Sequence, residues 1–152
     1  MRLTVAAVGG WKSGPERGLF EHYARRITFP FELKQVEEKK KLPPAALKKR
    51  EGELLLAKAP AGAVIVALDE KGKPLTSTGL AKKLGAWRDD GVKDVVFMIG
   101  GPGGLDAMVR KRADLRLSFG AVTWPHLLTR GLLAEQIYRA QCILSGHPYH
   151  RE

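Results

Sequence analysis

The last six residues of the chain hold the densest group of side chains that can do chemistry. They read His-Pro-Tyr-His-Arg-Glu and contain His147, Tyr149, His150 and Arg151. A histidine transfers protons near neutral pH, and an arginine binds a phosphate or stabilises a developing anion. The group has no arrangement of cysteines or carboxylates that would complete a zinc site, so we expect no metal. Because a chain end normally frays, the hexapeptide by itself favours a disordered tail over a site.

A second candidate site is a turn with four glycines that follows an apolar run. Residues 95–104 read Val-Val-Phe-Met-Ile-Gly-Gly-Pro-Gly-Gly, which indicates a central parallel strand and a turn at its carboxyl end. Glycines let backbone groups contact a ligand directly, and open α/β folds bind ligands at this edge. The turn lacks the Lys-Ser/Thr of a P-loop and the G-x-G-x-x-G spacing, which argues against a nucleotide triphosphatase. A purely structural turn remains the alternative.

A third candidate is the irregular apolar stretch before the last expected helix. Residues 119–126 read Phe-Gly-Ala-Val-Thr-Trp-Pro-His, and we expect the backbone to lie in the interior. Its N–H and C=O groups would then need partners, which a heterocycle such as adenine can supply through main-chain hydrogen bonds. A plain buried connection is the alternative, and the stretch by itself favours it.

Alternating strand and helix patterns position these three candidates. The sequence predicts strands at residues 2–8, 29–38, 63–69, 94–99 and 115–118. It predicts helices at 15–26, 43–58, 76–91, 105–113 and 126–144, and a charged loop at 70–74. This alternation predicts an α/β fold with a mainly parallel sheet flanked by helices. No linker divides the chain, so we expect residues 1–152 to form a single domain.

Positive charge dominates the composition. The chain has 26 Lys and Arg residues against 16 Asp and Glu, a net charge of +10. A small basic domain suits a polyanionic partner, although lysine that only maintains solubility explains the charge equally well. The lysine-rich segments 39–41 and 48–50 indicate solvated faces or contacts with RNA phosphates. On the last helix, Glu135 and Arg139 are four residues apart, which predicts a surface ion pair.

The remaining composition indicates a cytoplasmic protein. No apolar run is long enough to span a membrane, and the first residues do not resemble a signal peptide. The one cysteine, Cys142, permits no internal disulfide, which is typical of a reducing compartment. We therefore expect a cytoplasmic protein with no membrane partner.

Taken together, the three candidates resemble one known family. Their order is a strand with Gly-Gly-Pro-x-Gly, a loop that ends in Pro-His, and a terminal His-Pro-Tyr-His-Arg-Glu. This order is similar to that of the bacterial ribosomal RNA large subunit methyltransferase H family, which belongs to the SPOUT methyltransferases. The opening residues 3–9 and the apolar strand that ends in Leu68-Asp69 extend the resemblance over the whole chain.

This resemblance implies a specific activity. The family has a SPOUT-type α/β fold with a C-terminal trefoil knot, and it forms homodimers whose active site uses both subunits. It uses S-adenosylmethionine to methylate N3 of a pseudouridine in helix 69 of 23S rRNA, and it acts on assembled 70S ribosomes. A non-catalytic basic RNA-binding or ribosome-associated protein remains the alternative from a different class, and a nucleotide-dependent enzyme ranks last.

The resemblance also implies which residues bind and react. The residues assigned to the cofactor are Leu68, Gly100, Phe119, Gly120, Ala121, Val122, Thr123 and Trp124. Those assigned to the target nucleotide are His126, Tyr149, His150 and Arg151. Either His126 or His150 would accept the N3 proton, while Arg151 would hold a phosphate or the imide anion.

Two residues depart from the family pattern. Gly103 stands where the family usually has a glutamate, so a carboxylate near the cofactor or the dimer partner is missing. Leu127 replaces the proline that often follows the histidine, which we expect to loosen the start of the last helix.

Overall fold

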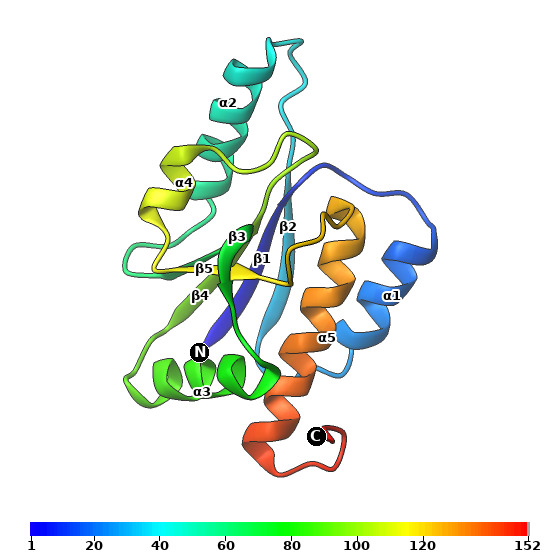
Figure 1. Cartoon of the computed structure of the whole chain (residues 1–152), viewed down its shortest axis with the longest axis vertical. Coiled ribbons are helices and arrows are strands. Elements are labelled where there is room, and N and C mark those ends of the chain that lie inside the picture. The colour runs from blue at the N-terminus through cyan, green and yellow to red at the C-terminus, as the bar shows by residue number, and fades with distance from the viewer. Residues whose placement is uncertain (152) are drawn as a thin grey trace.

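Five parallel strands form one sheet in the computed structural model, which describes residues 1–151 (Figure 1). The strands are β1 (Arg2–Val8), β2 (Phe31–Val36), β3 (Val64–Pro74), β4 (Asp94–Ile99) and β5 (Leu115–Ser118). Their order across the sheet is β2-β1-β4-β3-β5, and each of these neighbouring pairs is parallel. Parallel neighbours need crossover connections, which the helices supply.

Helices cover both faces of this sheet. They are α1 (Pro15–Ala24), α2 (Pro44–Leu56), α3 (Ser77–Asp89), α4 (Ala107–Arg112) and α5 (His126–Ser145). α1, α3 and α5 lie on the face that receives Leu3 and Val5 of β1, while α2 and α4 cover Ala6 and Val8 on the other. Alternate residues of a strand face opposite sides, so burial on both faces requires apolar strands. The predicted α/β class with a parallel sheet is confirmed.

Local signals set the helix ends close to the predicted positions. Thr76 caps α3 by accepting a hydrogen bond from the Gly79 N–H at 2.9 Å. Gly146 follows α5 with φ +75°, a left-handed conformation that lets the chain reverse direction. The His147 N–H then donates to the Cys142 carbonyl oxygen at 2.9 Å.

Within residues 1–151, no helix has both the length and the apolar character needed to cross a membrane.

One prediction about the strands is wrong. The sequence predicts a charged loop at residues 70–74, but β3 continues through them. β3 pairs with β5 as far as Leu68, and the pairing resumes at Lys73 after an irregularity. Gly72 permits this close approach, because a Cβ there would lie 2.6 Å from the Arg116 carbonyl oxygen. The charges hide the strand from the sequence pattern, since pairing at the edge of a sheet does not require apolar side chains.

A buried arginine joins α5 to the carboxyl end of β1. Arg130 has no exposed surface, and its Nη2 donates to the carbonyl oxygens of Val8 and Gly9 at 2.8 and 2.6 Å. Its Nη1 donates to the Gln35 side chain at 3.1 Å, and the guanidinium carbon lies 4.7 Å from the centre of the Trp11 ring. Burial lowers the pKa of Arg130 to about 10, so the group stays charged at neutral pH.

Replacing Arg130 with methionine should destabilise the fold, because the Val8 and Gly9 carbonyl groups lose their donor. Each buried acceptor left unpaired costs about 1–3 kcal/mol, so we expect a loss of about 2 kcal/mol or more. Urea unfolding followed by circular dichroism measures this loss. The matched control is Arg88→Met at an exposed position of α3, which should leave the unfolding midpoint nearly unchanged. Equal midpoints for the two variants would show that Arg130 does not tie the elements together.

Candidate functional site

The carboxyl ends of β4 and β5, together with the middle of β3, enclose a pocket of about 620 Å³. Its walls come from residues 68–71, from the glycine turn at 100–104, and from the loop at 119–126. Open α/β folds bind ligands outside this edge of the sheet, and pockets of about 300–1,000 Å³ hold small molecules. Two candidates that are far apart in the sequence therefore meet in one cavity.

Most residues predicted to bind the cofactor line this pocket. They are Leu68, Gly100, Phe119, Gly120, Val122, Thr123 and Trp124. Ala121 belongs to the same loop but is not among the lining residues. His126, predicted to face the target nucleotide, lines the pocket as well. The placement agrees with the predicted roles, which themselves stay predictions.

Backbone packing explains the glycines of the turn. A Cβ at Gly100 would lie 2.7 Å from the carbonyl carbon and oxygen of Gly104, so a larger residue would force the turn apart. The Gly104 N–H donates to the Gly101 carbonyl oxygen at 2.9 Å, and Gly104 has φ +81°. Gly103 has open space around it, so the absence of a glutamate there removes a side chain without altering the turn.

Side chains, rather than burial, hold the loop at 119–125. The Ser118 hydroxyl lies 3.0 Å from the Glu70 and Gly120 carbonyl oxygens, and Thr123 donates to the Glu70 carboxylate at 3.0 Å. The indole N–H of Trp124 donates to the Phe119 carbonyl oxygen at 3.2 Å.

The expectation of a loop in the interior is wrong for a single chain. Residues 121–125 are exposed, including Val122 at 58% and Trp124 at 41%. Apolar composition suggested burial, but the polar anchors before and within the loop let it stand at the surface. Large exposed apolar side chains of this kind often mark a surface that another molecule covers.

His126 is the first residue of α5 and faces the carboxyl end of β1. Its Nε2 would lie 3.9 Å from a Cβ placed on Gly9. Burial, and then the positive charge of Arg130, lower the pKa of His126 below its usual 6.5. The neutral imidazole, which can accept a proton, is therefore the form present near pH 7. The helix begins at His126 and the Thr129 N–H donates to Pro125, so Leu127 does not displace the first turn.

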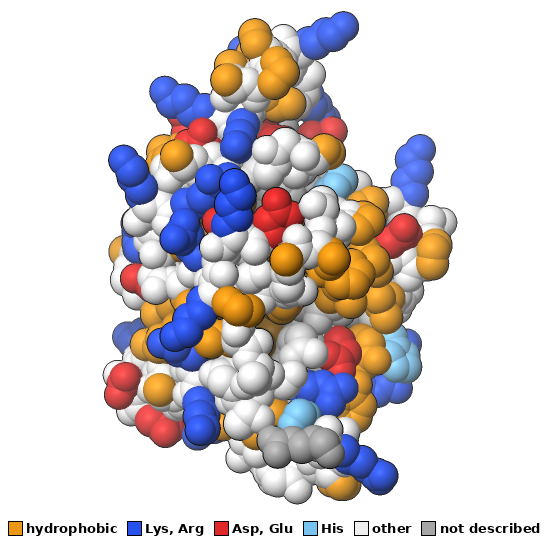
Figure 2. Space-filling view, in the orientation of Figure 1, with side chains coloured by type: hydrophobic (Ala, Val, Ile, Leu, Met, Phe, Trp, Pro, Cys, Tyr) orange, Lys and Arg blue, Asp and Glu red, His pale blue; other side chains and the backbone are white. Residues whose placement is uncertain are grey.

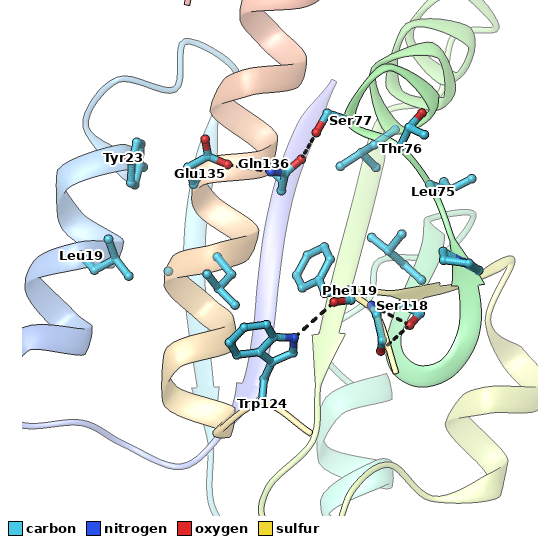
Figure 3. A pocket seen from close by; sticks show the side chains of 16 residues that line it. Leu19, Tyr23, Leu75, Thr76, Ser77, Ser118, Phe119, Trp124, Glu135 and Gln136 are labelled. Carbon is cyan, nitrogen blue, oxygen red and sulfur yellow. Dashed lines mark hydrogen bonds between the residues drawn. The ribbon is translucent and has the colours of Figure 1, made fainter. Parts of the chain in front are cut away.

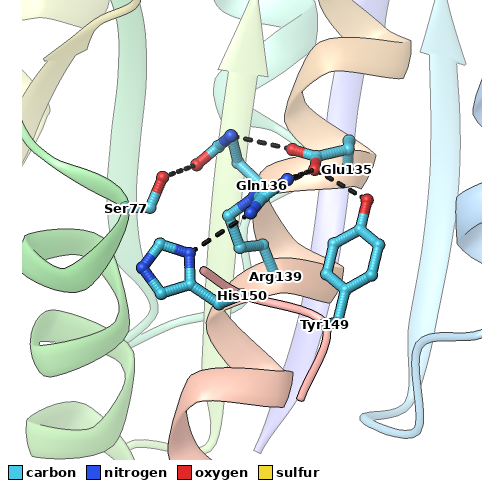
Figure 4. Close-up of polar contacts among 6 residues, drawn as sticks. All are labelled: Ser77, Glu135, Gln136, Arg139, Tyr149 and His150. Carbon is cyan, nitrogen blue, oxygen red and sulfur yellow. Dashed lines mark hydrogen bonds and ion pairs between the residues drawn. The ribbon is translucent and has the colours of Figure 1, made fainter. Parts of the chain in front are cut away.

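The terminal residues fold back on α5 in an ordered arrangement (Figure 4). The Tyr149 hydroxyl donates to Glu135 Oε1 at 2.9 Å, and Arg139 Nη2 lies 2.6 Å from the same oxygen. Arg139 Nη1 donates to His150 Nδ1 at 3.2 Å, and its guanidinium lies 4.7 Å from the centre of the Tyr149 ring. Burial raises the pKa of Tyr149, with hydrogen bonds to Tyr23 and Glu135 acting in the same direction, so it remains a donor.

These contacts correct two expectations. The tail is not disordered as far as Arg151, while Glu152 lies outside the described residues. The pair Glu135–Arg139 is not a simple surface ion pair, because both side chains are mostly covered and they anchor the tail. The sequence shows the spacing of this pair but not the tail that packs on it.

A single chain does not bring all the predicted reactive residues together. His126 lies at the start of α5, whereas Tyr149, His150 and Arg151 follow its end (Figure 1). The tail folds back along α5 only as far as Glu135, which Tyr149 contacts, so about 13 Å of helix still separates this contact from His126.

A groove of about 560 Å³ lies on the other side of the loop at 119–125, between α1, α3 and α5 (Figure 3). Apolar walls come from Leu19, Phe119, Trp124 and Leu132. Polar groups include Glu135 and Gln136, and Ser77 donates to Gln136 Oε1 at 2.7 Å. The sequence analysis assigned no site to α1 or α3, so it did not predict this groove.

Comparison with known proteins identifies the family. A family model described as "Predicted SPOUT methyltransferase" matches residues 1–150. The chain belongs to the SPOUT methyltransferase family.

The similarity of this SPOUT chain to particular proteins is high. It is 56% identical over 151 residues to ribosomal RNA large subunit methyltransferase H of Rhodospirillum centenum, with 99% of each chain covered. It is 58% identical over 151 residues to the protein of that name from Paramagnetospirillum magneticum, again with 99% of each covered. The solved structure of a probable methylase family protein from Haemophilus influenzae Rd KW20 superposes with a TM-score of 0.62 at 12% identity. That match covers 99% of this chain and 70% of the other, and it supports a shared fold.

Two residues of the SPOUT site escaped prediction from the sequence. Arg130 holds the start of α5, and Glu70 anchors the loop at 119–125. An arginine on a helix and a glutamate in a charged segment usually face solvent, so neither carries a signal of its role. Only the fold brings Arg130 to the carboxyl end of β1 and Glu70 into contact with Thr123.

His126 of this SPOUT chain should titrate below 6.5, because burial and the Arg130 charge disfavour its protonated form. The Cε1–H resonance, assigned with His126→Gln and followed against pH in the folded protein and in urea, measures the difference. Above pH 6.5 His126 is neutral in both states. Below it the unfolded state protonates first, so the folded state loses stability as pH falls. A folded-state pKa at or above the value in urea would contradict the electrostatic account.

Proposed function

We propose that the chain transfers a methyl group from S-adenosylmethionine to the ribosomal RNA of the large subunit. One observation carries the proposal: the glycine turn and the loop at 119–126, both assigned to the cofactor by resemblance, line one pocket. Membership of the SPOUT family and high identity to two proteins named ribosomal RNA large subunit methyltransferase H support it. The net charge of +10 suits an RNA substrate.

Backbone groups and apolar walls make the pocket suitable for S-adenosylmethionine. The Gly100 backbone approaches Gly104 so closely that no Cβ fits, which leaves main-chain groups to line the floor. We propose that Leu68, Gly100 and residues 119–124 hold the cofactor, mostly through main-chain contacts. When bound, S-adenosylmethionine supplies an electrophilic methyl group for direct displacement. No protein nucleophile is then needed, in agreement with Cys142, which is only 2% exposed.

The proposed target is N3 of a pseudouridine in helix 69 of 23S rRNA within the assembled 70S ribosome. N3 loses its proton as the methyl group arrives, so the site needs a base or a group that stabilises the anion. Of the two histidines left open, we favour His126, because it lines the pocket and its lowered pKa keeps it neutral. Tyr149, His150 and Arg151 would contact the nucleotide, with Arg151 holding a phosphate or the imide anion.

We propose a homodimer in which the tail of one subunit completes the pocket of the other. Within a chain, the tail is held against Glu135 and Arg139, about 13 to 20 Å along α5 from His126, which supports delivery of the tail by a partner. The groove between α1 and α5, together with exposed Val122 and Trp124, offers apolar surface that a second copy would cover.

The proposal also includes a C-terminal trefoil knot. The loop at 119–125 is hydrogen-bonded to Glu70 of β3 and borders the same pocket as the glycine turn. The next element in the chain, α5, packs against α1 and α3. These contacts bring the segment after β5 back to β3 and to the turn after β4, which supports passage of the C-terminal part of the chain through the preceding loops. We further propose that residues 1–152 act as one domain and that the ribosomal substrate places the protein in the cytoplasm.

Labelled methyl transfer from S-adenosylmethionine tests the function. We expect incorporation into 70S ribosomes that lack the methyl group, little into protein-free 23S rRNA, and a reverse-transcription stop at one helix 69 pseudouridine. S-adenosylmethionine should also raise the melting temperature, since a ligand at 100 times its Kd stabilises by about 2.7 kcal/mol. If the RNA gains no label and S-adenosylmethionine does not raise the melting temperature, a non-catalytic RNA-binding protein becomes the better account.

Deletion of residues 149–152 should abolish methyl transfer while the fold, the dimer and cofactor binding persist. Size-exclusion chromatography, melting curves and cofactor titration check these properties.

A complementation experiment mixes the deletion variant with the Gly100→Val variant. The Gly100→Val variant should lose cofactor binding, because the valine side chain meets the Gly104 backbone. If two subunits share each site, refolding the inactive variants together restores activity in the mixed dimers. No recovery, despite mixed dimers, would mean that the tail acts within its own subunit.

A further inference from the structure

Residues 37–43 connect β2 to α2 and form an ordered segment that we name the lysine arm. Glu38 turns inward: its Oε1 accepts the Lys40 N–H at 3.1 Å, and its Oε2 accepts from Arg50 Nε at 3.0 Å. The Glu38 side chain is only 14% exposed, whereas Lys39, Lys40 and Lys41 are all exposed. The hydrogen bond from Lys40 and then Arg50 hold the pKa of Glu38 below its usual value, so the anchor stays ionised at neutral pH.

The lysine arm lies at the same edge of the sheet as the cofactor pocket. β2 is separated from β4 only by β1, and all three strands are parallel. Neighbouring strands lie about 4.8 Å apart, so the arm leaves the sheet about 10 Å from the start of the glycine turn. Figure 2 shows Lys and Arg side chains projecting around this upper end of the molecule, where Figure 1 places α2.

Charge pairing distinguishes this arm from the basic group on the opposite side of the pocket. There, Arg110 and Arg116 both approach the Asp69 carboxylate, at 3.6 and 3.9 Å. In the arm, the inward Glu38 carboxylate is matched by Arg50, and the three adjacent lysines outnumber the one exposed carboxylate, Glu37, so the arm keeps a net positive charge. Exposed, strongly hydrated ammonium groups suit a partner whose negative charges repeat closely along a chain.

We propose that the lysine arm binds the phosphate backbone of the RNA substrate a few nucleotides from the base that enters the pocket, an inference that rests on the proposed function. The lysines follow the end of β2 by three to five residues, so they lie farther from the glycine turn than the point where the arm leaves the sheet, at a distance of several phosphates along a nucleic-acid strand. Each phosphate contact releases counterions and makes binding depend on salt. Such contacts position the substrate without reading its sequence.

The test compares charge reversal in the arm with the same reversal elsewhere. The arm variant carries Lys39→Glu, Lys40→Glu and Lys41→Glu. The control carries Lys82→Glu, Lys83→Glu and Lys93→Glu, which are exposed on α3 and just before β4, at the lower end in Figure 1. Steady-state methyl transfer to unmethylated 70S ribosomes, sedimentation with those ribosomes, and anisotropy of a labelled oligouridylate are measured from 50 to about 200 mM salt.

The arm variant should raise KM about tenfold or more with kcat nearly unchanged, because it loses substrate docking rather than chemistry. Its salt slope for oligouridylate should fall by about 2, at roughly 0.7 per lost contact on a single strand. The control should retain most of the wild-type KM and slope. Glu38→Gln keeps the lysines but loosens their anchor, so it should raise KM in the same direction by less.

Several results would overturn the proposal. Equal effects of the arm and control variants would mean that only total charge matters. A fall in kcat without a change in KM would remove the docking role. Weaker ribosome binding with unchanged oligouridylate binding would assign the arm to a ribosomal protein instead. If the arm variant melts early, the triple Lys→Gln variant repeats the comparison. If the wild-type protein binds ribosomes through the arm but transfers no methyl group, the proposed function is wrong and the role of the arm in RNA binding stands.

Discussion

The buried guanidinium of Arg130 is the contact on which the rest of the carboxyl edge depends. It holds the first turn of α5 against the end of β1 through the Val8 and Gly9 carbonyl groups, and it packs on Trp11. No carboxylate among residues 1–151 forms an ion pair with it, so carbonyl dipoles and an aromatic face provide the compensation. A cation held in this way costs desolvation energy, yet it places a fixed positive charge beside His126. The Arg130 side chain therefore both holds α5 against β1 and, in addition to burial, lowers the pKa of His126.

The pocket is assembled from segments that the chain visits at different times. β4 contributes the glycine turn, β3 contributes Glu70, and the segment after β5 is hydrogen-bonded to Glu70. Parallel strand order brings these ends together, because every carboxyl end emerges at the same edge. Side-chain anchors then fix the loop at 119–125 where backbone burial does not. If the pocket holds the cofactor mostly through main-chain groups, as proposed, it needs this rigidity, because main-chain groups adapt less than side chains.

The sequence patterns predicted the elements that depend on apolar burial, and they missed the features that depend on pairing between distant segments. The strand before Gly100 and the alternation of elements are visible because both faces of a parallel sheet must be apolar. The continuation of β3 through Gly72 is not visible, since an edge pairing tolerates charged residues. The exposed position of Trp124 and the ordered tail also depend on contacts over long sequence separations, with Phe119 and Glu135. Family resemblance supplied the predicted site residues, and only the fold shows that most of those assigned to the cofactor line one pocket.

Gly146 gives the tail a defined reach. Its left-handed conformation turns residues 147–151 back along α5, so that Tyr149 meets Glu135 rather than continuing beyond the helix. If that reversal opens, the six residues 146–151 span at most about 20 Å when extended. The backbone of Arg151 therefore stays within a sphere of that radius around the end of α5, and the side chain extends this reach only by its own length. In the proposed homodimer, this reach would set an upper limit on the distance between the end of α5 in one subunit and the pocket of the other.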